Sequence, residues 1–303
     1  MTIAIHGLGR MGMQISRKLS EANHLVIAHN RSFEKSEEAA RFGAKPAATK
    51  EDVVKLFDTE PVIIWIMLPA EIVDQQIDEW FELLPKGSIL IDGGNSDFRL
   101  TKELSARVEA KGFKLVDVGV SGGVWGYQNG FSMMAGANDR QAFEVIEPAL
   151  IDLAKPEGGY AYFGESGSGH FVKMVHNAIE YGMMESLAEG YRFLKDGPYG
   201  NLDLAAAGEV WQHHSVITSW LNQLCRDALK ENPTLEGING YVAENGEARW
   251  TLEVANSMNI GMPSIESALD VRLASQKGEI NFSTQLLAAM RNLFGGHALN
   301  KDD

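Results

Sequence analysis

Short runs of apolar residues recur through the first half of the chain. They lie at residues 2–6, 25–28, 62–68, 88–91, 114–118, 131–135 and 160–163. Strands without alternating polar positions are typical of a mainly parallel sheet that helices cover on both faces. The pattern therefore predicts an α/β fold class, with a Rossmann-type doubly wound sheet over residues 1–166.

Helical spacing replaces these runs in the remainder of the chain. Apolar positions recur with a period of about 3.6 residues in the segments 170–195, 203–229, 248–258, 264–277 and 282–294. Gly-Pro, Asn-Pro and Gly-Met-Pro sequences separate several of these segments, as expected for turns between helices. We therefore predict a second, all-helical domain over residues 167–303.

A glycine-rich turn follows the first apolar run. It reads Gly7-Leu8-Gly9-Arg10-Met11-Gly12 and leads into a helical pattern. A G-x-G-x-x-G turn between a strand and a helix lets the backbone approach a pyrophosphate at the helix N-terminus. We therefore predict that these six residues bind a dinucleotide. Ligands of open α/β sheets lie beyond the carboxyl ends of the strands, so Met67, Leu68, Pro69 and Asn95 are predicted to line the same crevice.

The choice of nicotinamide depends on the turn after the second apolar run. An NAD site usually has an Asp or Glu there, which binds the ribose hydroxyls, whereas an Arg accommodates the 2′-phosphate of NADP. This chain has Asn30, Arg31 and Ser32 at that place. The turn therefore favours NADP, with NAD as the alternative because an arginine can also stack on adenine. Glu34 lies in the first turn of the next helix, where it is expected to face solvent.

Five polar side chains share one face of the helix predicted at 170–195. They are Lys173, His176, Asn177, Glu180 and Tyr181. The other faces are apolar, so the helix is predicted to be buried, and its polar face then needs partners or a cavity. We interpret this face as the wall of a site. The alternative is a core helix whose polar groups are satisfied by neighbouring helices.

A second glycine-rich turn is predicted at residues 119–123, after the apolar run at 114–118. Its backbone N–H groups can cradle an anion. The alternative is a tight turn without a ligand.

Charge and composition exclude several classes of partner. The formal net charge is −14 and the isoelectric point is near 5.0, so the chain lacks the basic surface that nucleic acid or an anionic membrane requires. The single cysteine, Cys225, excludes a disulfide within the chain and indicates a reducing compartment, most simply the cytoplasm. The eight histidines have no metal-binding spacing, so we expect no metal site.

Together, these motifs resemble those of 6-phosphogluconate dehydrogenase, decarboxylating, in its short form, a family of the β-hydroxyacid dehydrogenase superfamily. The resemblance runs over nearly the whole chain and is most specific from Gly169 to Gly182. It also includes Gly7–Gly12, Asn30-Arg31-Ser32, Asp92-Gly93-Gly94-Asn95, Ser121-Gly122-Gly123, Arg249-Trp250-Thr251 and the tail Arg291–His297.

The resemblance implies an NADP- or NAD-dependent enzyme that converts a phosphorylated sugar acid, 6-phosphogluconate, to ribulose 5-phosphate and CO2 in the pentose phosphate pathway. It implies that Lys173 is the general base and Glu180 the general acid. The substrate contacts that it implies are Asn95, Ser121, Gly122, Gly123, His176, Asn177, Tyr181, Arg249, Arg291 and His297. The phosphate site departs from the long form of the family, which has an arginine beyond the position of Trp211 and a lysine at the position of Arg249.

The resemblance also implies an assembly. The long form has two copies of the helical unit and this chain has one, so we expect a second chain to cover an apolar face in a homodimer or homotetramer. In the family, the residues that match Arg291 and His297 act in the site of a neighbouring subunit. Two alternatives stay open: a β-hydroxyacid dehydrogenase that does not decarboxylate, and a dinucleotide-sensing protein without turnover.

Overall fold

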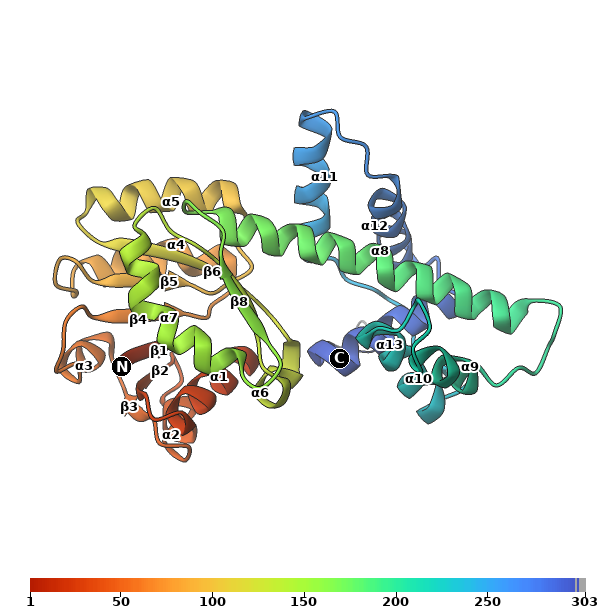
Figure 1. The fold of residues 1–303 in the computed structure, drawn as a ribbon, viewed down its shortest axis with the longest axis horizontal. Helices are drawn as coiled ribbons and strands as arrows, with labels where there is room; N and C mark the ends of the chain where they lie inside the picture. The colour runs from red at the N-terminus through yellow and green to blue at the C-terminus, as the bar shows by residue number, and fades with distance from the viewer. Residues whose placement is uncertain (298, 300–303) are drawn as a thin grey trace. The chain divides into compact units, whose positions relative to one another are not determined.

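The computed structural model describes residues 1–297 and residue 299. The chain divides into two compact units, Met1–Lys173 and Met174–Asp303 (Figure 1). The first unit contains a sheet covered by helices, and the second contains helices. This arrangement confirms the predicted fold class.

One sheet organises the first unit. Its strands are β1 (Thr2–His6), β2 (Leu25–His29), β3 (Lys45–Ala47), β4 (Ile63–Ile66), β5 (Ile89–Asp92), β6 (Lys114–Ser121), β7 (Ser132–Gly136) and β8 (Gly159–Tyr162). Their spatial order is β3-β2-β1-β4-β5-β6-β7-β8, and the pairing of β6 with β7 is antiparallel while the others are parallel. The strand order reverses between β1 and β4, the kind of position at which open α/β sheets bind ligands.

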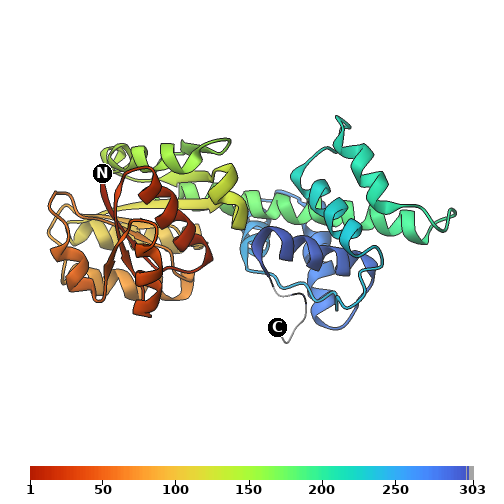
Figure 2. The same ribbon diagram turned by 90° about the horizontal axis from the view of Figure 1, so that it is seen from below.

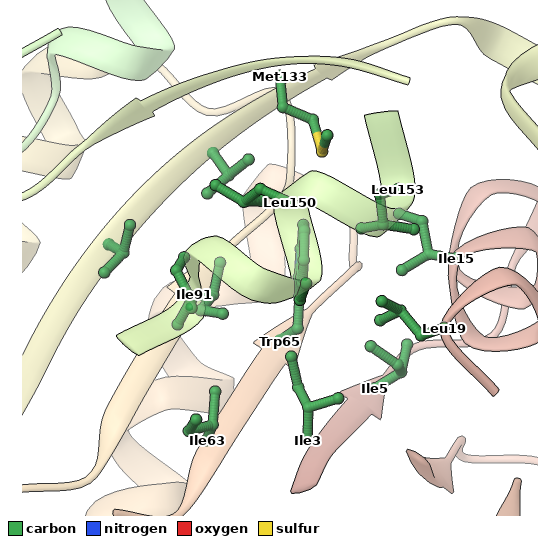
Figure 3. Close-up of a cluster of buried hydrophobic side chains, with 14 of the residues drawn as sticks. Ile3, Ile5, Ile15, Leu19, Ile63, Trp65, Ile91, Met133, Leu150 and Leu153 are labelled. Atoms are coloured by element: carbon green, nitrogen blue, oxygen red, sulfur yellow. The ribbon is translucent and has the colours of Figure 1, made fainter. Parts of the chain in front are cut away.

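Helices cover both faces of this sheet, which explains why most of its strands are mainly apolar. The helices are α1 (Arg10–Glu21), α2 (Phe33–Ala40), α3 (Lys50–Lys55), α4 (Ala70–Phe81), α5 (Phe98–Ala110), the 3₁₀ turn η1 (Gly123–Trp125), α6 (Gly126–Asn129) and α7 (Arg140–Ala154). On one face, α1 and α7 contribute Ile15 and Leu150 to a core over the strands (Figure 3). On the other face, α4 and α5 contribute Ile77 and Leu104.

Two features of the sheet differ from the sequence predictions. No apolar run predicts β3, because this edge strand pairs with β2 alone and buries only Ala47. Residues 119–121, predicted as part of a turn, instead continue β6, because Gly119 pairs with Met134 and Ser121 with Ser132 of β7. The turn begins at Gly122, whose φ of +125° favours glycine.

Helices make up the second unit. They are α8 (Ser168–Asp196), which begins in the first unit, α9 (Leu204–Gln212), α10 (Trp220–Glu231), α11 (Glu247–Ser257), α12 (Pro263–Gln276) and α13 (Phe282–Gly295). Helix α8 is 29 residues long. Figure 2 shows it as one unbroken helix. Its residues Met184 and Tyr191 join Cys225 of α10 and Leu287 of α13 in one buried core.

The single helix predicted at 203–229 is in fact two helices. Helix α9 ends at Gln212, and His214 takes a positive φ of 62°, which ends helical geometry. Ser219 then caps α10, because its hydroxyl oxygen accepts the N–H of Asn222 at 3.0 Å. Within the described part of the chain, no helix has both the length and the apolar character needed to cross a bilayer.

Candidate active site

The glycine turn after β1 has a backbone shape that requires glycine. Gly7 has a φ of +105°, and a Cβ there would lie 2.5 Å from the carbonyl oxygen of Met67. A Cβ at Gly12 would lie 1.9 Å from the carbonyl oxygen of Gly7, whereas one at Gly9 would meet nothing within 4 Å. The turn is closed toward the sheet and open at Gly9, which fits a pyrophosphate that approaches the start of α1.

The other residues of this turn connect it to β2 and α1. Leu8 is buried, and its N–H donates to Oδ1 of Asn30 at 3.0 Å, which joins the turn to the end of β2. Arg10 is exposed and Met11 is half-buried at the start of α1. Asn30 is therefore oriented by the backbone of the glycine turn.

The next strand ends extend the same edge of the sheet. After β4, Met67 and Leu68 are half-buried and Pro69 is exposed. After β5, Asn95 is exposed in a turn that Asp92 shapes by accepting the N–H of Gly94 at 3.0 Å. The predicted cofactor residues thus lie at the carboxyl ends of neighbouring strands, where a dinucleotide is expected.

The turn after β2 contains a carboxylate close to the predicted phosphate-binding residues. Arg31 is exposed. The hydroxyl of Ser32 donates to Oε2 of Glu34 at 2.5 Å, and this hydrogen bond lowers the pKa of the Glu34 carboxyl. Glu34 is exposed, as expected. It also accepts the hydrogen bond of the Ser32 hydroxyl, which was predicted to bind the cofactor.

Lys173 lies against the backbone of β6. The residue is 6% exposed, and a Cβ added to Gly119 would lie 2.3 Å from the Cβ of Lys173. The lysine stem therefore packs on β6, two residues before Ser121. Ser121, Gly122 and Gly123 are half-buried where β6 ends.

Three large polar side chains form a buried group in the second unit. The guanidinium carbon of Arg272 lies 3.2 Å from the ring centroid of Tyr181. Arg272 is 2% exposed and Arg291 is 6% exposed. Burial lowers the pKa of Arg291, and it lowers that of Arg272 to about 10, so Arg272 keeps its charge near neutral pH. Among the described residues, neither arginine forms an ion pair with a carboxylate.

A partly ionised carboxyl group lies near Arg272. Glu185 of α8 is 6% exposed, and its Oε2 is buried without a hydrogen-bond partner among residues 1–297. Burial, followed by the neighbouring Glu189, raises its pKa to about 7, while Arg272 acts in the opposite direction. Near neutral pH, Glu185 therefore compensates the positive charge of Arg272 only in part. The group around Tyr181 is suited to binding an anion.

Arg272 was not predicted as a site residue, although the sequence contains a signal for it. Helix α12 buries Ile265, Ala268, Leu269 and Ser275 together with Arg272. An arginine four residues after Ala268 thus lies within an otherwise small and apolar stripe. A charged residue in such a stripe needs a function or a partner.

The polar face of α8 between Lys173 and Tyr181 is satisfied in part by α11. The amide of Asn177 donates to Oε1 of Glu247 at 2.9 Å, and Nδ1 of His176 lies 2.9 Å from Oδ1 of Asn177. Glu247 is 2% exposed and was not predicted. Glu180 is half-buried. A neighbouring helix thus satisfies part of this face, and its role as the wall of a site stays a prediction.

Three further predicted substrate residues lie on elements other than α8. Arg249 is exposed and pairs with Glu244 at 2.9 Å. His297 folds back on the end of α13, where its ring lies edge-on to Phe294 at 6.1 Å between centroids. Arg291 interacts with Tyr181 of its own chain, because α13 packs in the same core as α8. That Arg291 acts in the site of a neighbouring subunit stays a prediction.

One side of α8 is exposed, contrary to the prediction of a helix buried all round. Ile179 is 50% exposed and Met183 is 44% exposed. They line an apolar groove of about 580 Å³, together with Gly182, Ser186, Leu187, Gly190, Trp211, Val216, Ile217, Thr218, Ser219, Ser264 and Ile265.

Family profiles and relatives match nearly the whole chain. The profile described as the NAD binding domain of 6-phosphogluconate dehydrogenase matches residues 2–165, and the profile of that enzyme's C-terminal domain matches residues 169–285. The NAD(+)-dependent, decarboxylating 6-phosphogluconate dehydrogenase of Haloferax volcanii is 36% identical over 306 residues, and the match covers 100% of both chains.

Solved structures have the same fold. The 6-phosphogluconate dehydrogenase of Plasmodium falciparum gives a TM-score of 0.83 at 25% identity, over 96% of this chain and 70% of that one. The 3-hydroxyisobutyrate dehydrogenase of Mycobacterium tuberculosis gives 0.72 at 21% identity, over 94% and 97%. This second likeness concerns the fold alone.

The doubly wound sheet, the glycine turn and the matched profiles define an oxidoreductase with a nicotinamide dinucleotide-binding domain. Within this class, the chain belongs to the 6-phosphogluconate dehydrogenase family.

Proposed function

We propose that this protein oxidises and decarboxylates 6-phosphogluconate to ribulose 5-phosphate and CO2. The observation that carries the proposal is the pair of buried guanidinium groups, Arg272 and Arg291, beside Tyr181. Neither cation forms an ion pair with a carboxylate in the described chain, although the charge of Glu180 acts on both. Buried guanidinium groups placed in this way favour the binding of an anion, and guanidinium suits phosphate. A β-hydroxyacid dehydrogenase whose substrate lacks a phosphate would not need this pair.

Helix α8 supplies two groups for the reaction. A nicotinamide held at the glycine turn Gly7–Gly12 would supply the acceptor for the hydride of substrate C3. Lys173, whose stem is buried on Gly119, takes the proton of the C3 hydroxyl as a general base. Glu180, two turns further along the same helix, donates a proton to substrate C2, which becomes C1 of ribulose 5-phosphate, after CO2 has left. A dinucleotide sensor would need the glycine turn but neither of these two groups.

The substrate proposal is tested by comparing 6-phosphogluconate, gluconate and 3-hydroxyisobutyrate in assays of nicotinamide reduction. We expect kcat/KM for 6-phosphogluconate to exceed that for gluconate by about 10²-fold or more, the effect of losing two charge-assisted contacts. A preference for 3-hydroxyisobutyrate would support the non-decarboxylating alternative. Dinucleotide binding without turnover of any of the three would support the sensor.

We propose NADP as the preferred nicotinamide and keep NAD as the alternative. The position after β2 that carries a carboxylate in NAD sites is Asn30, whose Oδ1 already accepts the N–H of Leu8. Because Ser32 donates to Glu34, Arg31 is the group available to the 2′-phosphate. Arg31 is a permanent cation with a fork of donors that suits phosphate.

Replacement of Arg31 by alanine is expected to raise the KM for NADP by about 10- to 10²-fold, equivalent to about 1.5–3 kcal/mol, and to change that for NAD little. Glu34→Gln should lower the KM for NADP, because it removes a negative charge from the same turn. The exposed Arg41→Ala serves as the matched control. A higher kcat/KM with NAD than with NADP for the unmodified enzyme would contradict the proposal.

We propose that a second copy of this chain covers the apolar groove along α8, in a homodimer or homotetramer. Gly182, Ser186 and Gly190 follow one another at intervals of four residues and line the groove, so a helix can approach α8 closely. Val216 and Ile217 are 104% and 46% exposed at its rim. Such a patch on a single chain is typical of a protein interface.

Ser186→Arg is expected to convert the assembly to monomers, because it places a charged, bulky side chain in the groove. The mass measured by sedimentation velocity should fall to that of one chain. Thr234→Arg adds the same charge at an exposed turn and should leave the assembly intact. An unchanged mass in Ser186→Arg would show that the groove is not the interface.

A further inference from the structure

The start of α8 lies directly on the sheet, because glycines line both surfaces. A Cβ at Gly169 of α8 would lie 2.4 Å from the carbonyl oxygen of Met134. A Cβ at Gly136 of β7 would lie 2.6 Å from Oγ of Ser168. Both distances are far shorter than van der Waals contact, so neither glycine can gain a side chain unless the helix moves. The first turn of α8 is therefore in backbone contact with β7.

A carboxylate from the sheet caps this first turn. Asp117 of β6 is fully buried and accepts the N–H of Gly167 at 2.7 Å and that of His170 at 2.9 Å. Burial raises the pKa of its carboxyl, whereas the charge of His170 and the two N–H bonds lower it. A negative group is favourable at a helix N-terminus, where N–H groups lack helical partners. The strand thus supplies the cap of α8.

The same face of β6 also supports Lys173. Residues two apart on a strand point to one face, so Asp117 and Gly119 both face α8. Gly119 contacts the Lys173 stem, and Asp117 holds His170, which precedes Lys173 by one turn. A second element steadies that turn, because Nδ1 of His170 lies 2.8 Å from Oγ1 of Thr101 on α5.

We propose that Asp117 is a positioning residue for Lys173, which fixes the first turn of α8 so that the lysine amine meets the substrate hydroxyl. The inference rests on the proposed function, in which Lys173 is the general base. A displacement of about 1 Å can cost about 10²-fold in rate, so the two N–H bonds of Asp117 affect turnover as well as stability. Asp117→Asn keeps the size of the side chain but has one acceptor oxygen, so it retains only one of these bonds.

The test compares Asp117→Asn with Asp139→Ala. Asp139 caps α7 in the same unit, where it accepts the N–H of Gln141 at 2.9 Å. We expect Asp117→Asn to lower kcat by about 10- to 10²-fold and to leave the KM for NADP within about twofold. The isotope effect with substrate deuterated at C3 should rise, because the chemical step becomes slower than product release. Asp139→Ala should lower Tm and change neither kinetic quantity.

An unchanged kcat and isotope effect in Asp117→Asn would overturn the inference. If this variant does not fold, the nearly isosteric Thr101→Val decides in its place: a raised isotope effect supports the positioning role, and an unchanged one overturns it. Lys173→Met separates this inference from the proposed function. Normal turnover in Lys173→Met would contradict the proposed function. If Lys173→Met is inactive and Asp117→Asn turns over normally, only the positioning role of Asp117 is contradicted.

Discussion

Replacement of Lys173 by methionine is expected to lower kcat by about 10²-fold or more, with little change in the KM for the nicotinamide. Methionine keeps the length of the stem that packs on Gly119 but removes the amine that takes the C3 proton. The loss should therefore appear in turnover and not in folding. Steady-state rates with 6-phosphogluconate, measured together with Tm, check this expectation.

Lys195→Met is the matched control for this experiment. Lys195 lies on the same helix but is exposed near its end, where it pairs with Asp196. It should keep normal turnover. If both lysine variants turned over at the normal rate, Lys173 would not be the base, and the reaction would have to use another group.

Arg272→Met is expected to raise the KM for 6-phosphogluconate by about 10²-fold or more while leaving the protein as stable as before, or more stable. The guanidinium is buried without a carboxylate ion-pair partner in the described chain, and replacing such a cation by an apolar side chain of similar volume is often neutral or stabilising. The phosphate, by contrast, loses charge-assisted bonds of about 1.5–3 kcal/mol each. Substrate titration and thermal unfolding measure the two effects separately.

Two comparisons make this result specific. The weak activity expected with unphosphorylated gluconate should not change in Arg272→Met, because that substrate has no phosphate to lose. Arg192→Met removes an exposed guanidinium from α8 and should alter neither KM nor stability greatly. An equal rise of KM for both substrates would mean that Arg272 supports the site only through packing on Tyr181.

Much of the fold follows from the sequence, because strands that are buried on both faces need apolar residues at nearly every position. The strand β4 is apolar throughout, β1 and β5 are apolar except at their ends, and the glycine turn has a backbone shape at Gly7 that favours glycine. Edge strand β3 buries one residue, so its sequence lacks the apolar run that would predict a strand. The division between α9 and α10 depends on the backbone of His214 and the cap at Ser219, which a periodic pattern does not contain.

The candidate site was predictable where its residues lie on one element. Helical spacing places Lys173, His176 and Glu180 on one face of α8 without knowledge of the tertiary fold. Arg272 and Glu247 reach this helix from α12 and α11, so their part in the site depends on packing between helices that are distant in sequence. The exposed side of α8 could not be foreseen, because an apolar surface for a second chain has the same composition as a core.

We propose that this chain couples nicotinamide reduction to loss of CO2 from 6-phosphogluconate. The most direct test uses substrate labelled with ¹³C at C1 and measures labelled CO2 and reduced nicotinamide in the same reaction. We expect one labelled CO2 for each nicotinamide reduced. Reduced nicotinamide that accumulates without labelled CO2, or no reduction with this substrate, would contradict it.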